Sequence, residues 1–127
     1  MLLMQPIDDH ADCFLWASEK SGFQHLYIRS SAGNEICQLT RGEWIVDAVV
    51  GVDQLNKRVY FTGNRESPLE THLYVVQFAN TSNIEEPRRL TEERGRHTVV
   101  ISNHFKSFID TVMVKSRCQE REIQDQI

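Results

Sequence analysis

The chain has 127 residues, of which 40% are hydrophobic and 25% are charged, and its formal net charge is −4. This composition is typical of one ordinary globular domain, and the lack of a basic excess argues against a nucleic-acid-binding protein. No window reaches the roughly 18 apolar residues of a membrane span, and the apolar segment 1–4 lacks the basic residues of a signal peptide.

Short runs rich in β-branched and aromatic residues, separated by Gly, Asn, Asp, Ser or Pro clusters, predict an all-β protein. The first three runs predict antiparallel strands at 13–18, 25–28 and 35–40. The next run, 44–52, is almost continuously apolar, which predicts a strand buried on both faces. The remaining runs lie at 58–63, 72–78, 88–91, 97–102 and 107–114.

The two ends of the chain give weaker patterns. Residues 1–12 are interpreted as an N-terminal remnant, within which 1–7 is the one segment that would supply a missing first strand. Residues 115–127 are polar and rich in charge, so we expect a short helix or, preferably, a disordered tail.

An internal repeat explains the order of these strands. The tripeptide His25-Leu26-Tyr27 recurs as His72-Leu73-Tyr74, and the QLT of 38–40 recurs as the RLT of 89–91. A repeat of roughly 40–50 residues made of short strands is typical of a β-propeller blade. We therefore expect a partial β-propeller with one complete four-stranded antiparallel blade, 44–91, flanked by incomplete blades at about 13–40 and 97–114. A closed ring needs about 4–8 blades, so the chain is interpreted as a piece of a larger propeller.

Several segments resemble the N-terminal propeller of the dipeptidyl peptidase IV family of serine peptidases. They are FLWASEKSGFQHLY, LTRGEW, VYFTG, SPLETHLYVV and RRLT, and they occur in the family's order. The likeness covers about 13–111 and is greatest to the branch of plant members and cytosolic dipeptidyl peptidases eight and nine. Residues 112–127 match nothing in the family pattern.

The resemblance implies a non-catalytic segment of a two-part exopeptidase involved in proteolysis. In such an enzyme the propeller gates substrate access and supports oligomer contacts, and an α/β-hydrolase domain carries a Ser-Asp-His triad. The implied partners are the rest of the propeller, the hydrolase domain, and a second copy or full-length relative. No nucleophile-elbow motif occurs here, so we predict no catalytic residue, no cofactor site, no metal site and no peptidase activity for this chain alone.

Residues of catalytic or ligand-binding type have simpler interpretations here. The acidic cluster Asp8, Asp9, His10, Asp12 and Cys13 lacks defined metal-ligand spacing, and Glu85-Glu86 lies outside the family's substrate-binding context. His25 and His72 occupy equivalent places in two repeats, which favours packing or turn hydrogen bonding over catalysis.

The other residues of this kind are placed by their neighbours in the sequence. We expect aromatic packing for Trp16, Trp44, Phe61 and Tyr74, and a solvated loop for Arg88, Arg89, Arg94 and Arg96. Ser67-Pro68 is expected to form a turn, and Cys118 to be an exposed, oxidisable thiol in the tail without tuned reactivity.

The three cysteines, Cys13, Cys37 and Cys118, form no disulfide framework, and a cytoplasmic location is expected. One alternative is a free-standing interaction module that binds a protein through open sheet edges. Another is an unrelated propeller or sandwich with a small-molecule site. No nucleic-acid or membrane partner is expected.

Overall fold

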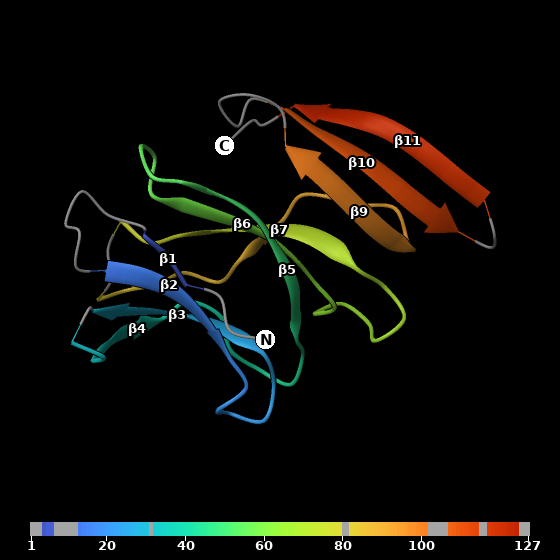
Figure 1. The fold of residues 1–127 in the computed structure, drawn as a ribbon. Helices are drawn as coiled ribbons and strands as arrows, with labels where there is room; N and C mark the ends of the chain where they lie inside the picture. Colours follow the sequence, from blue (N-terminus) through green and yellow to red (C-terminus); the bar gives the residue numbers. More distant parts are fainter. Residues whose placement is uncertain are drawn as a thin grey trace.

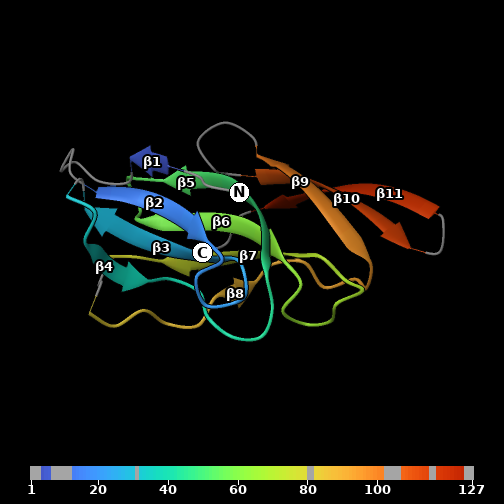
Figure 2. The ribbon, with the colours of Figure 1, turned by 60° about the horizontal axis from the view of Figure 1, so that its bottom comes forward.

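The computed structural model describes residues 4–6, 13–30, 32–79, 82–101, 107–114 and 117–124, and every regular element in these ranges is a β-strand. The strands form three antiparallel sheets that follow one another along the chain (Figures 1 and 2). Within the described ranges, no helix is long and apolar enough to cross a membrane.

Each sheet is built from consecutive strands. The first contains β1 (Met4–Pro6), β2 (Cys13–Ser18), β3 (His25–Ser30) and β4 (Glu35–Gln38), in that order. The second contains β5 (Val46–Asp53), β6 (Arg58–Gly63), β7 (His72–Gln77) and β8 (Arg88–Arg89). The third contains β9 (Arg96–Ile101), β10 (Ser107–Val114) and β11 (Arg117–Gln124), with β10 in the middle. The predicted all-β partial propeller is confirmed.

The first sheet has four strands where the sequence predicted three. β1 pairs with β2 through Met4↔Trp16 and Pro6↔Phe14, so the N-terminal segment supplies the strand that was left open. Two sheets are therefore four-stranded, not one. The apolar alternation in 4–6 is too short to give a strand signal by itself, and pairing to the long edge of β2 determines its conformation.

The prediction of helix or disorder for the tail was wrong. β11 forms a hairpin with β10, with the register running from Val114↔Arg117 to Ser107↔Gln124. A strand edge carries a row of free N–H and C=O groups, and pairing with β11 satisfies those of β10. This pairing depends on the backbone, so the polar sequence of the tail gave no hydrophobic pattern to predict it.

The second sheet is buried on both faces at its central strands, but not at β5, the strand for which the sequence predicted such burial. β5 was expected to be buried on both faces, yet Asp47 and Ala48 are exposed and Val49, Val50 and Gly51 are only partly buried. The central strands β6 and β7 are the ones almost wholly buried. β5 is the first strand of its sheet and lies beside an open cleft, and two register shifts against β6 turn its side chains further.

Two separate hydrophobic cores hold the three sheets together. The larger lies between the first and second sheets and includes Leu15, Leu26, Trp44, Phe61 and Tyr74, all buried. The smaller lies between the second and third sheets and consists of Tyr60, Leu73, Val75 and Phe108, with Val50, Leu90 and Val99 at its margin. Since successive residues of β6 and β7 point to opposite faces, Phe61 joins the first core and Tyr60 the second.

Candidate functional site

A buried histidine and a threonine are bonded in the same way in the first two sheets. His25 Nδ1 lies 2.8 Å from Thr40 Oγ1, and the Leu26 N–H donates to the same oxygen at 3.0 Å. His72 Nδ1 lies 2.8 Å from Thr91 Oγ1, which the Leu73 N–H contacts at 3.1 Å. The repeated HLY and LT motifs therefore bind each other across each sheet, and both histidines have the hydrogen-bonding role that the repeat predicted.

The same histidines contact the next sheet along the chain. The His25 ring meets the Trp44 ring edge-on at 4.9 Å, and its Nε2 donates to the Gly42 carbonyl at 2.8 Å. The residue before each histidine adds a backbone bond, because Gln24 O accepts from the Val46 N–H at 2.8 Å and Thr71 O from the His97 N–H at 2.9 Å. The repeat unit thus carries its own connection to its neighbour.

The second junction replaces the tryptophan by a histidine. The rings of His72 and His97 lie 4.9 Å apart, and His97 Nδ1 lies 2.7 Å and 2.8 Å from the two carboxylate oxygens of Asp110. His97 Nε2 lies 2.6 Å from the Glu93 carbonyl oxygen. His97 and Asp110 are 4% and 1% exposed, so this charged pair is enclosed between the sheets.

Hydrogen-bond roles give His25 and His72 one proton state and His97 another. Nε2 of His25 faces the Gly42 carbonyl and Nε2 of His72 faces the Glu70 carboxylate, which are both acceptors, so in the neutral ring Nε2 carries the proton and Nδ1 accepts from the threonine hydroxyl. Burial lowers the pKa of His25 and of His72. Both nitrogens of His97 face acceptors, and the Asp110 carboxylate and Glu93 raise its pKa despite the opposing effect of burial.

This cluster has the components of a base and its orienting acid, but not the access that catalysis requires. A general base needs one ring nitrogen within reach of a substrate proton, and both nitrogens of His97 are occupied inside the protein. Among the described residues, no group of three or more His, Cys, Asp or Glu side chains is placed to hold a metal ion. The His97–Asp110 pair is therefore a buried structural pair of the third sheet, and its histidine ring contacts His72 of the second sheet.

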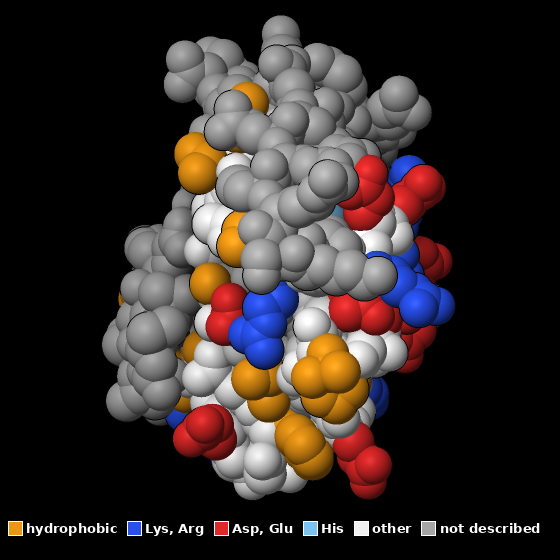
Figure 3. Space-filling model, turned by 90° about the vertical axis from the view of Figure 1, so that its right-hand side faces the viewer, with side chains coloured by type: hydrophobic (Ala, Val, Ile, Leu, Met, Phe, Trp, Pro, Cys, Tyr) orange, Lys and Arg blue, Asp and Glu red, His pale blue; other side chains and the backbone are white. Residues whose placement is uncertain are grey.

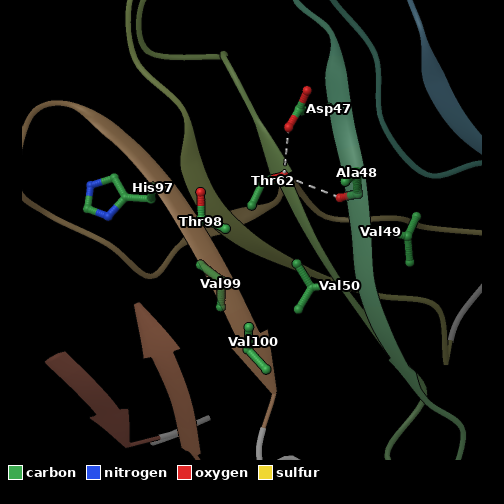
Figure 4. A pocket seen from close by; sticks show the side chains of 9 residues that line it. All are labelled: Asp47, Ala48, Val49, Val50, Thr62, His97, Thr98, Val99 and Val100. Atoms are coloured by element: carbon green, nitrogen blue, oxygen red, sulfur yellow. Dashed lines mark hydrogen bonds between the residues drawn. The ribbon is translucent and has the colours of Figure 1, made fainter. Parts of the chain in front are cut away.

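An open cleft lies beside this cluster, between β5 and β9 (Figure 4). Its volume is about 460 Å³. The lining residues are Asp47, Ala48, Val49, Val50, Thr62, His97, Thr98, Val99 and Val100. The Thr62 hydroxyl lies 3.5 Å from an Asp47 carboxylate oxygen and 3.4 Å from the Ala48 carbonyl oxygen. The walls of the cleft are therefore mostly small or β-branched side chains, with polar groups at one end. Such a surface can contact another molecule but offers no arrangement for catalysis.

Among the described side chains of the third sheet, the most exposed large apolar ones are Val100 and Met113, at 62% and 49%. Figure 3 shows this side of the molecule, with acidic and basic side chains beside the described apolar ones. Isolated apolar side chains of this kind are normal on a protein surface.

The other residues singled out from the sequence lie in structural settings. Trp44, Phe61 and Tyr74 pack together, with ring centres 5.5–6.1 Å apart. The Trp16 ring lies under the Arg29 guanidinium, at 5.2 Å. Asp8, Asp9, His10 and Asp12 lie outside the described residues, and nothing is described of the Cys118 side chain.

The loops and thiols need no binding role either. Arg89 donates to the carbonyls of Thr91 and Glu92, whereas Arg88, Arg94 and Arg96 are exposed. The Ser67 hydroxyl accepts from the Leu69 N–H inside a turn. Glu85 and Glu86 are exposed and lie apart from the cleft. Cys13 and Cys37 are partly buried and are not joined in a disulfide, and burial raises the pKa of Cys37 to about 11.

Sequence reasoning missed the pair formed by His97 and Asp110. The available signal was Asp110 itself, which stands between Phe108 and Val112 on the buried side of β10. An acid at an inward position of a strand requires a cationic or hydrogen-bonding partner.

Comparison with known proteins gives the family directly. The family described as the dipeptidyl peptidase IV N-terminal region matches residues 2–115. The chain belongs to this family. It is 37% identical over 123 residues to dipeptidyl peptidase 8 of Homo sapiens, covering 76% of this chain and 13% of that protein. It is 39% identical over 61 residues to a protein of Emericella nidulans named "Probable dipeptidyl peptidase 4", covering 48% of this chain and 8% of that protein.

A solved structure has the same fold. The crystal structure of Porphyromonas gingivalis dipeptidyl peptidase 4 superposes with a TM-score of 0.77 at 23% identity, covering 90% of this chain and 16% of that one. The predicted family membership is confirmed, and the arrangement of sheets agrees with the family's N-terminal region. The chain spans roughly one seventh of the length of its full-length relatives, at 13% of the human protein.

Proposed function

We propose that this chain is a non-catalytic propeller segment of a dipeptidyl-peptidase-IV-like serine exopeptidase, in which it borders the substrate entrance and supports oligomer contacts. The observation that carries the proposal is the cleft between β5 and β9, taken with the family match over residues 2–115. Innermost strands of a propeller border the central channel, and these two strands present exposed side chains there.

The composition of the cleft supports passage rather than tight binding. Ala48 and Thr98 are exposed and short, and Val100 offers an apolar contact without a charged group. Tight small-molecule sites combine an enclosed apolar cavity with convergent polar groups, and the cleft has its polar groups at one end only. Cys13 and Cys37 are thiols and not a disulfide, which supports the proposed cytoplasmic location.

The first experiment uses the purified 127-residue chain with a glycyl-prolyl chromogenic substrate. We expect no release of dipeptide, because the chain contains no nucleophile elbow. Measurable turnover that co-purifies with the chain and is abolished by a serine-hydrolase inhibitor would contradict the non-catalytic assignment.

The second experiment tests the entrance. In the human relative, tryptophan replaces the residues aligned with Ala48 and Thr98, one at a time. If these positions border the entrance, kcat/KM for a long peptide falls several-fold more than kcat/KM for a dipeptide chromogenic substrate. The control is the position aligned with Leu55, which is 90% exposed in the β5–β6 turn away from the cleft. Equal losses for long and short substrates would contradict a role in access.

A second candidate function is a free-standing module that binds a protein partner. The observation that favours it is β4, which in the described part of the chain pairs only with β3 and leaves Ile36 41% exposed at the sheet edge. Such an edge is a template for strand addition. Sedimentation of the chain, alone and with a full-length relative, distinguishes the cases. A complex that Ile36→Lys abolishes favours the module, and a monomer at all concentrations argues against it.

A further inference from the structure

The junction between the second and third sheets contains a titratable pair that its neighbour between the first and second sheets lacks. At the first junction His25 meets the uncharged Trp44. At the second, His72 meets His97, and His97 is bonded to Asp110. The two junctions therefore have the same architecture and different electrostatics. The second adds the His97–Asp110 pair, and His72 Nε2 faces the Glu70 carboxylate where His25 Nε2 faces the Gly42 carbonyl.

The hydrogen-bond geometry requires a proton on His97. A neutral imidazole has one N–H, and the other nitrogen must accept a hydrogen bond. Nδ1 faces only the Asp110 carboxylate, and Nε2 faces only the Glu93 carbonyl. Loss of the proton would set a lone pair against an acceptor and would leave the charge of Asp110, which is 1% exposed, without a counter-ion.

The remaining groups around His97 do not replace that proton. His72 of β7 is neutral, because its Nε2–H donates to Glu70 at 2.9 Å and its Nδ1 accepts from Thr91. Arg89 acts on His72 and not on His97, and the charge of Glu93 favours the protonated form. The groups that face His97 come from β7, from the loop before β9 and from β10. None of those named replaces its proton, so His97 carries the positive charge at this junction.

We propose that the contact between the second and third sheets depends on the protonation of His97, so that the third sheet is held at neutral pH and loosens in alkaline solution. His97 and Asp110 lie on neighbouring strands of the third sheet, β9 and β10, and protonation of His97 makes the pair neutral overall, so that it can be buried against the second sheet. The apolar part of this junction is small, with Tyr60, Leu73, Val75 and Phe108 as its buried residues, so an uncompensated charge there would weaken the contact. Because β9 also forms one wall of the cleft, loosening would widen the cleft. This inference concerns the chain itself and does not rest on the proposed function.

The direction follows from linkage. A histidine whose pKa is raised on folding binds its proton more tightly in the folded state, so its stabilising effect is complete below the unfolded pKa of about 6.5. The effect is lost as pH rises through the folded pKa of His97. The contribution of His97 to the junction should therefore be complete in mildly acidic solution and should be lost as pH rises.

Nitrogen-15 NMR of the histidine rings in the full 127-residue chain tests the proposal. At pH 7.5 we expect both ring nitrogens of His97 to be protonated, and His25, a buried histidine without a carboxylate partner, to be neutral. In D110N, the ratio of protonated to neutral His97 at that pH should fall at least about tenfold, which corresponds to one pKa unit. The matched control is E92Q, an exposed acid of the adjoining loop, which should change nothing.

Amide hydrogen exchange supplies the structural readout. In the unmodified chain, amides of β9 and β10 should exchange faster as pH rises, beyond the intrinsic base catalysis seen in β6 and β7, with the same midpoint as the His97 titration. This measurement decides the matter even if D110N does not fold. A neutral His97 at pH 7.5, or a β9–β10 exchange profile that does not follow His97, would overturn the proposal.

Discussion

The threonine at the end of each LT motif should contribute far more to the free energy of unfolding than an exposed threonine of the same chain does. Thr91→Val keeps the shape of the side chain but removes the hydroxyl that joins His72 to the backbone. It leaves two buried groups without partners: the Leu73 N–H and the lone pair of His72 Nδ1. An unsatisfied buried polar group costs about 1–3 kcal/mol. We therefore expect a loss of about 2–4 kcal/mol in the free energy of unfolding.

Equilibrium urea denaturation measures this loss, provided that the m-value is unchanged. Thr40→Val makes the same change in the first sheet, where the distances are 2.8 Å and 3.0 Å, and should cost a similar amount. Thr98→Val is the control, since Thr98 is an exposed threonine on β9 and should change stability by less than about 0.5 kcal/mol. If either T40V or T91V destabilised the chain no more than T98V, the assignment of the threonine as the bridging group would be refuted.

Three further changes test other parts of the structure. Gly42→Ala places a Cβ 2.8 Å from the Trp44 indole nitrogen at a φ of +120°. We expect it to lower the free energy of unfolding, measured by urea denaturation, by about 1–3 kcal/mol more than Gly33→Ala, whose Cβ meets open space. Equal losses would show that Trp44 does not constrain Gly42. Iodoacetamide should modify Cys37 at pH 8 roughly a hundredfold more slowly than the same cysteine in an unfolded peptide, because its pKa of about 11 lies above the usual 9.0 and each unit reduces the thiolate tenfold. Stability should fall between pH 7 and pH 5, since the lowered pKa values of His25 and His72 make the unfolded chain bind more protons, and His25→Gln should flatten that profile; an unchanged slope would contradict the neutral state assigned to His25.

Much of the strand pattern could be predicted from the sequence because it depends on local hydrophobic alternation. The runs at 13–18, 58–63 and 107–114 coincide with β2, β6 and β10. The family could be inferred as well, since the HLY and LT motifs are repeated and occur in the family's order. The structure shows that these motifs bond to each other within one sheet. These features are local in the chain or are repeated, and both properties leave a visible pattern.

Features that depend on contacts between sheets could not be predicted in the same way. β1 and β11 are strands because an edge is available to pair with them. The partial exposure of β5 follows from its place beside a cleft, which an apolar sequence does not reveal. The partnership of His97 with Asp110 links residues on adjacent strands whose register places Asp110 opposite Val99, and no motif announces it.

Because the interior is divided into two cores, unfolding of either outer sheet should be coupled to the middle sheet and not to the other outer sheet. Among the described residues, the first and third sheets share no hydrophobic core, and each shares one with the second. Stability in such a series is a sum over nearest neighbours. A change at Phe108 should therefore leave protection of the first sheet intact, whereas one at Phe61 should lower it. The middle sheet, supported from both sides, should be the last to open, and partial unfolding should begin at the third sheet, which the smaller core joins to the second.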